Sequence, residues 1–144
     1  MYIFKRLTIL IAILLFSSAS VSDQRSDIDV FVNSFMEALS GNDIASIVAM
    51  NEWDGLSEQQ RKSIELSYTD IAVKGVVSFR VDNIDDGESI SFEKKGNVFS
   101  PNLIPLAQLF IDVNVNKDFR GGYSFYIGKD NGIFKFSHVV LKNP

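Results

Sequence analysis

The chain has 144 residues and a formal net charge of −4; 46% of its residues are hydrophobic, 12% aromatic and 22% charged. This composition is typical of one globular domain and argues against disordered, collagen-like and disulfide-stabilised classes. With no cysteine and one histidine, the sequence excludes disulfides, iron–sulfur clusters, cysteine nucleophiles and metal sites that need two histidines. We expect no metal and no cofactor.

Residues 1–22 have the three regions of a secretory signal peptide. Lys5 and Arg6 precede an apolar run from Leu7 to Phe16, and small or polar residues follow it. The run is too short for a membrane span, which needs about 20 residues. We predict cleavage between Ala19 and Ser22, export to the periplasm or out of the cell, and no membrane contact after cleavage. An uncleaved signal anchor is the alternative.

Residues 23–144 are expected to form a single α+β domain. Removal of residues 1–22 leaves 12 basic and 18 acidic residues, a net charge of −6. Adjacent basic residues occur in this range only at two isolated pairs, Arg61-Lys62 and Lys94-Lys95. Because nucleic acid binding depends on positive charge facing the phosphates, we predict no nucleic-acid partner.

The first part of this domain has a helical pattern. Apolar residues recur every three or four positions from a start at Ser26, and Gly41 can end this helix in the left-handed conformation. A short second helix is expected to start at Asn42 or Asp43. The predicted inward stripe of the first helix consists of Ile28, Phe31, Val32, Phe35, Met36 and Leu39.

The third predicted helix begins with a capping box. The Ser57 side chain can accept a hydrogen bond from the Gln60 amide while Gln60 reaches back. Helical spacing then places Tyr68 on the same face as Ile64 and Ile71.

After about Ala72 the apolar period shifts towards two, and β-branched and aromatic residues predominate. The loop from Gly96 to Pro105 and the Asn131-Gly132 pair separate strands, and the latter is a strong hairpin signal. The predicted strands are 73–81, 89–94, 106–115, 123–128 and 133–141.

The register of this last hairpin determines which odd- and even-numbered side chains share a face of the sheet. Odd positions of 123–128 lie with even positions of 133–141, so Phe125 shares a face with Phe136 and His138. The opposite face is expected to meet water and carries Ser124, Tyr126, Lys135 and Ser137.

Three helices followed by a curved antiparallel sheet that ends in YSFYIGKDNGIFKFSHVV resemble the nuclear transport factor 2-like superfamily. The resemblance implies N-terminal helices packed on a curved antiparallel sheet, a cystatin-like, half-open cone that encloses a pocket. Members range from isomerases and dehydratases to binding and assembly domains, so the fold does not imply one function. Enzymes of this group use an aspartate with a tyrosine, or a histidine pair. The chain cannot supply a histidine pair, and no aspartate aligns securely with the isomerase base.

Two residues are weak catalytic candidates. His138 is placed on an apolar face, where burial lowers the pKa of an imidazole and suits it to act as a base. Tyr68 could donate its hydroxyl to a ligand carbonyl. In each case the alternative is an ordinary packed side chain with its hydrogen bonds satisfied. The predicted pocket-lining residues are Phe31, Phe35, Tyr68, Phe125, Phe136 and His138.

Two other segments have simpler interpretations. Residues 82–93 partly match a calcium loop, but Ile84 replaces an oxygen ligand, so a solvated acidic turn is expected. Trp53 could cover the cone or anchor a partner, and a packing role is favoured. Asp70 and Asp112 are expected to face water.

Three functional classes follow. The favoured one is an exported, non-catalytic domain that binds a small apolar ligand or a protein. The second is a cofactor-free isomerase- or dehydratase-like enzyme that uses Tyr68 and His138, which requires both side chains to converge on one cavity. The third is a homodimeric assembly module whose polar sheet face pairs with another copy. Whether the chain is an enzyme stays open, with the non-catalytic interpretation preferred.

Overall fold

The computed structural model describes residues 23–85 and 90–142. The chain divides into two compact units, Met1–Ser34 and Phe35–Pro144, and each is described by itself. The predicted signal peptide lies outside the described residues, so both it and the extent of the single domain stay predictions. In the described ranges, no helix is long and apolar enough to cross a membrane.

In the first unit, residues 23–34 are helical. Ile28 and Val32 are buried and Phe31 is half-buried, in agreement with the predicted apolar stripe. Ser26 lies inside the helix and does not cap it, because the three residues before it are already helical.

In the second unit, residues 35–40 are helical and the backbone then reverses at Asn42, whose φ is 53°. Asn42, and not Gly41 as predicted, takes the left-handed position, and the next amide donates to Ala38 at 2.8 Å. Asparagine tolerates this conformation because its short polar side chain can hydrogen-bond locally.

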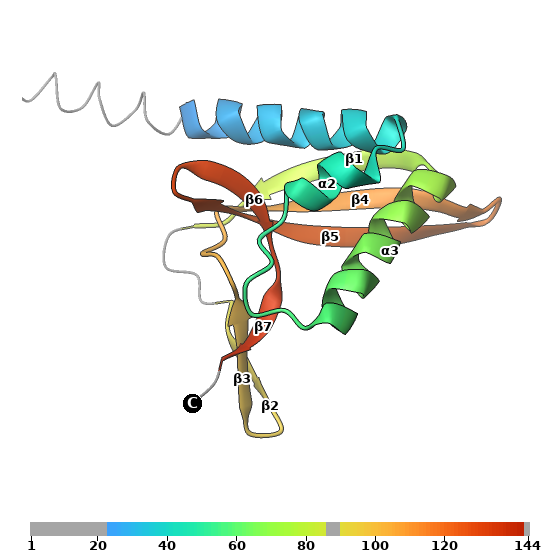
Figure 1. Cartoon of the computed structure of the whole chain (residues 1–144). Helices are drawn as coiled ribbons and strands as arrows, with labels where there is room; N and C mark the ends of the chain where they lie inside the picture. The colour runs from blue at the N-terminus through green and yellow to red at the C-terminus, as the bar shows by residue number, and fades with distance from the viewer. Residues whose placement is uncertain (1–22, 86–89, 143–144) are drawn as a thin grey trace, which may run out of the picture. The chain divides into compact units, whose positions relative to one another are not determined.

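Two further helices follow (Figure 1). Helix α2, Ile44–Ala49, is capped by Asp43, whose side chain accepts from the Ser46 amide. Helix α3, Glu58–Lys74, begins with the predicted capping box of Ser57 and Gln60 and ends at Gly75, whose φ is 80°. Tyr68 and Ile71 are fully buried on its inner face.

The strands form two antiparallel sheets. The four-stranded sheet has the order β1-β4-β5-β6, with β1 at Val76–Asn83, β4 at Ala107–Asn116, β5 at Phe119–Asp130 and β6 at Ile133–Ser137. The three-stranded sheet has the order β2-β3-β7, with β2 at Phe92–Lys94, β3 at Asn97–Pro101 and β7 at Val139–Lys142. Helices with antiparallel sheets confirm the predicted α+β class.

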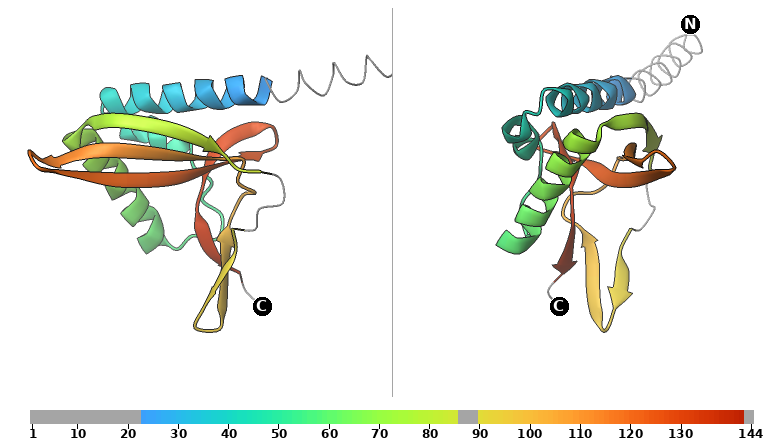
Figure 2. Two further views of the ribbon diagram at one scale, coloured as in Figure 1. Left: turned by 180° about the vertical axis from the view of Figure 1, so that it is seen from behind. Right: turned by 90° about the vertical axis from the view of Figure 1, so that its right-hand side faces the viewer.

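The predicted strands need several corrections, among them that β2 starts at Phe92 and β5 already at Phe119. Val73 still belongs to α3 and is 79% exposed, so the first strand starts at Val76. Residues 97–101, predicted as loop, form β3, because cross-strand pairing with β2 on one side and β7 on the other stabilises them as the central strand. The predicted strand 133–141 is interrupted at His138, and the chain passes there from one sheet to the other (Figure 2).

The predicted hairpin is present with a two-residue turn. Asp130 pairs with Ile133, and Asn131 and Gly132 have φ of 48° and 83°, as a type I′ turn requires. Ile127 pairs with Phe136 and both are fully buried, which confirms the predicted parity. The opposite face is not uniformly wet, because Ser137 is only 3% exposed.

The loop 102–105 lies against Gly128 of β5. A Cβ atom at Gly128 would stand 2.6 Å from Leu103 Cβ and 2.9 Å from the Ile104 carbonyl oxygen. Both contacts are closer than packed atoms allow, so this glycine permits the loop to approach the sheet.

We predict that Gly128→Ala lowers the free energy of unfolding by about 1 to 3 kcal/mol, because the loop must move to avoid the new methyl group. Denaturant titration measures this change. Gly122→Ala is the matched control on the same strand, since a Cβ there meets only ordinary contacts, the nearest at 3.8 Å. Equal stability of the two variants would contradict the close approach.

Candidate functional site around Asn51, Tyr68 and His138

The segment after α2 runs beside β6 and fixes the position of Asn51. The Phe136 amide donates to the Met50 carbonyl at 2.8 Å, and the Glu52 amide donates to the Phe136 carbonyl at 2.9 Å. These bonds form a parallel bridge between Asn51 and Phe136. Asn51 is only 4% exposed, so its amide group needs partners inside the protein.

The orientation of the Asn51 side chain follows from its contacts. Its Nδ2 donates to the carbonyl oxygens of Ile47 and Val48, at 2.6 and 3.4 Å. Its Oδ1 is therefore the acceptor, and it receives the Tyr68 hydroxyl at 2.5 Å and His138 Nε2 at 2.7 Å. The two candidates from the sequence thus converge on one oxygen atom.

This geometry sets the tautomer of His138. Because Oδ1 of an amide can only accept, Nε2 must carry the proton. Burial lowers the pKa of His138 from 6.5 to about 4, so the ring is neutral at neutral pH and Nδ1 has a free lone pair. Among the described residues, no hydrogen bond is made to Nδ1.

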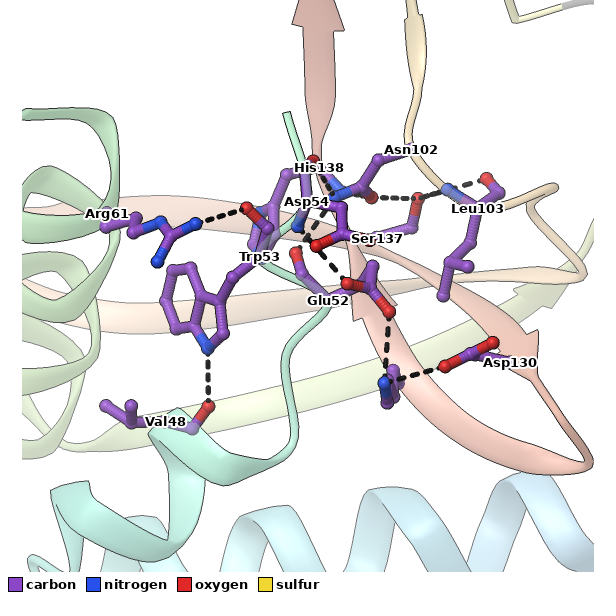
Figure 3. Close-up of polar contacts among 11 residues, drawn as sticks. Val48, Glu52, Trp53, Asp54, Arg61, Asn102, Leu103, Asp130, Ser137 and His138 are labelled. Atoms are coloured by element: carbon purple, nitrogen blue, oxygen red, sulfur yellow. Dashed lines mark hydrogen bonds and ion pairs between the residues drawn. The ribbon is translucent and has the colours of Figure 1, made fainter. Parts of the chain in front are cut away.

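Trp53 covers one side of this imidazole. The two rings stack with centroids 5.7 Å apart and planes 16° from parallel. The indole Nε1 donates to the Val48 carbonyl at 3.1 Å, and Arg61 donates to the Trp53 carbonyl at 3.0 Å (Figure 3). Trp53 is half-buried and has the packing role that the sequence favoured.

Asn102 joins the same corner from the other side (Figure 3). Its Oδ1 accepts from the His138 amide at 2.8 Å and from the Ser137 hydroxyl at 3.1 Å. Its Nδ2 donates to the Glu52 and Asp54 carbonyls at 2.9 and 3.0 Å. Neither Asn51 nor Asn102 was predicted, because each bonds to groups that are distant in sequence: side chains for Asn51 and mainly backbone groups for Asn102.

An ion pair reinforces the junction between residues 50–54 and β6. Lys135 contacts Glu52 at 3.0 Å and Asp130 at 2.9 Å. The hydrogen bond from Lys135 lowers the pKa of Glu52, against the opposing effect of burial. Lys135 was predicted on the wet face, yet it is half-buried by these contacts.

The two aspartates expected to face water, Asp70 and Asp112, differ in how exposed they are. Asp112 is exposed and accepts from the Ser78 hydroxyl at 2.7 Å. Asp70 is half-buried, pairs with Lys74 at 2.6 Å and accepts the Tyr123 hydroxyl. Two hydrogen bonds lower the pKa of Asp70; the one from Lys74 has the larger effect and the one from Tyr123 the smaller. Through its bond to Tyr123, Asp70 links α3 to β5.

The aromatic residues predicted to line a pocket pack on one another. Phe35 lies 5.8 Å from Tyr68, 6.2 Å from Phe125 and 4.8 Å from Phe136 between ring centroids. Phe35, Tyr68 and Phe136 are fully buried. Phe31 belongs to the other unit. The assignment of these residues and His138 as pocket lining stays a prediction.

Two hollows are lined by other residues of the second unit. One, of about 340 Å³, lies where α3 ends and β1 begins. The other, of about 540 Å³, lies beside the three-stranded sheet and loop 102–105. Ranges 23–85 and 90–142 contain no group of three or more His, Asp or Glu residues able to hold a metal ion.

Tyr68 and His138 are thus close enough for joint acid–base chemistry. However, the Tyr68 hydroxyl proton and the His138 Nε2 proton are both already donated to Asn51 Oδ1. Burial raises the pKa of the Tyr68 hydroxyl, which keeps it protonated as a donor to Asn51. The Asn51 oxygen occupies the position that a substrate carbonyl would take between the two donors. In this arrangement the Tyr68 hydroxyl and Nε2 of His138 both bond to Asn51 Oδ1 and link α3 to the junction of β6 and β7.

Comparisons with known proteins assign no family. No protein-family model matches the chain, and no curated protein matches it significantly. One solved structure, described as a provisionally assigned calcium/calmodulin dependent protein kinase II association domain from Xanthomonas campestris, is 13% identical, with a TM-score of 0.38. The alignment covers 81% of this chain and 86% of that one. A likeness at this level carries no argument, so the superfamily resemblance stays a prediction from the sequence.

The buried neutral imidazole predicts a pH dependence of stability. The pKa of His138 is about 4 in the fold against 6.5 for an ordinary histidine. As the pH falls below about 6.5, the unfolded chain gains a proton that the folded chain does not, so the free energy of unfolding decreases. The loss reaches at most about 3 kcal/mol near pH 4.

Denaturant titrations from about pH 7.5, above the ordinary pKa of 6.5, down to about pH 4.5, just above the pKa of about 4 in the fold, measure this loss. His138→Gln is the matched variant, because its side-chain amide can still donate to Asn51 and does not titrate. We expect a smaller decrease in this variant than in the wild type. An identical pH profile in both proteins would show that His138 is not held neutral.

Proposed function

We propose that this chain is an exported, non-catalytic domain that binds a small apolar ligand. The proposal is carried by the hollow of about 340 Å³ at the C-terminal end of α3. Ligand sites in proteins usually have volumes of about 300 to 1,000 Å³ and mainly apolar walls. The lining residues are Met36, Leu39, Ser40, Ile71, Ala72, Gly75, Val76 and Phe79.

The walls of this hollow suit an apolar guest. Of its lining residues, Leu39 and Ile71 are buried, at 4% and 0% exposed, whereas Phe79 is 46% exposed. Ser40 supplies the single polar side chain among the lining residues. A guest would bind by removing apolar surface from water and not through directed polar contacts.

The state of Tyr68 and His138 supports a non-catalytic function. An isomerase- or dehydratase-like mechanism needs both groups to touch a substrate, whereas both donate to Asn51. Neither residue lines the hollow at the end of α3. The enzyme alternative would require this buried network to open before any reaction.

Filling the hollow tests the proposal. Ala72 is half-buried on α3, and Ala72→Phe would place a ring in the space that a ligand needs. With N-phenyl-1-naphthylamine as a neutral fluorescent probe, we expect saturable binding by the wild type and affinity at least about tenfold weaker in the variant.

The matched control is Val73→Phe, because Val73 is the next residue, is 79% exposed and does not line the hollow. This variant should bind the probe like the wild type. Absence of saturable binding to the wild type, or equal binding by Ala72→Phe, would rule out this ligand site.

Export is a part of the proposal supported by the charged, apolar and small-residue regions of residues 1–22. When the full chain is expressed in a secreting bacterial host, we expect a mature protein that begins between residues 20 and 23, with Asp23 favoured. Intact mass spectrometry measures the start. Recovery of the chain with Met1 retained would contradict export by cleavage.

A further inference from the structure

The hollow beside the three-stranded sheet is separate from the ligand site proposed above and shares no lining residue with it. It has a volume of about 540 Å³. Its walls come from the end of β3, from β7, from the turn at Asp54 and Gly55, and from loop 102–105. Prolines and aliphatic side chains of this wall are Ile90, Pro101, Leu103, Ile104, Pro105 and Val140.

Ser100 gives this hollow an unusual polar group. Ser100 is 3% exposed, and its Oγ is buried without a hydrogen-bond partner in the described part of the chain. Buried hydroxyl groups in proteins are nearly always paired, so such a group calls for an explanation. A ligand that supplies the missing partner is one.

The strand register places the Ser100 side chain on the hollow side of β3. Ser100 pairs with Val140, and a Cβ atom on Gly55 would lie 3.4 Å from the Val140 side chain. Val140 and Gly55 both line the hollow. The preceding residue, Phe99, points to the opposite face and stacks on Phe92 at 5.3 Å.

The surroundings of Ser100 favour a ligand without charge. A charged ligand group in this hollow would lose its hydration, and the Ser100 hydroxyl would be its one compensating hydrogen-bond partner. Burying a charge with so little compensation costs much free energy. The charged residues of the hollow, Asp54 and Lys142, are exposed and opposite in sign, so they select no net charge.

We propose that this hollow binds a neutral small molecule whose carbonyl or hydroxyl oxygen hydrogen-bonds to Ser100 and whose apolar body packs on Val140 and Leu103. The ligand would supply a hydrogen-bond partner to the one buried side-chain oxygen that has none among the described residues. This site lies outside the hollow at the end of α3, so either proposal can fail alone.

A matched set of probes tests the site on the mature protein. Acetophenone and 1-phenylethanol carry the neutral oxygen, ethylbenzene lacks it, and phenylacetate carries a negative charge on a similar body. Amide chemical shifts followed during titration should move at residues 100–105 and 140. We expect the neutral oxygen compounds to bind at least about tenfold more tightly than ethylbenzene, as one hydrogen bond provides.

Ser100→Ala keeps the size of the hollow and removes the hydroxyl, so the preference over ethylbenzene should fall below about twofold. Ser124→Ala, an exposed serine on β5, is the control and should retain the preference. Ala72→Phe should also retain it. The proposal is overturned if no neutral oxygen compound binds at residues 100–105 and 140, if phenylacetate binds more tightly, or if Ser100→Ala keeps the preference.

Discussion

The side-chain amide of Asn51 connects the parts of the second unit. Its nitrogen bonds to the last turn of α2, its oxygen accepts from Tyr68 of α3 and from His138 between β6 and β7, and its backbone bridges to Phe136. Because the residue is buried, each bond that is lost would leave a polar group without water, which costs more than the bond itself contributes. The amide therefore fixes the bend where the chain passes between its two sheets.

This constraint places the Tyr68 and His138 network apart from the two hollows. The titratable groups that a catalyst would use are the groups that hold the bend, and His138 is neutral because it is buried there. Space for a guest occurs elsewhere, at the end of α3 and beside β3 and β7. This separation is the basis of the proposed binding function, since binding sites need mainly apolar walls and a few placed polar groups.

Local patterns predicted the parts of the fold that local interactions determine. The Ser57 capping box, the Asn131-Gly132 turn and the inward faces of Tyr68 and Phe136 each depend on neighbours a few residues away. Asn51 and Asn102 could not be predicted, because their partners lie up to 87 residues away in sequence and an asparagine at a turn looks the same whether or not it bridges two segments. The break at His138 was missed for a similar reason, since the apolar alternation continues through it while the backbone changes sheets.

The central claim is that Asn51 holds His138 as a neutral imidazole with its proton on Nε2. The chain has one histidine, so a long-range ¹H–¹⁵N spectrum of the ring gives unambiguous signals. The account predicts a protonated Nε2 and an unprotonated Nδ1, unchanged between pH 8 and about 5. A proton on Nδ1, or titration of the ring near the ordinary pKa of 6.5, would contradict it.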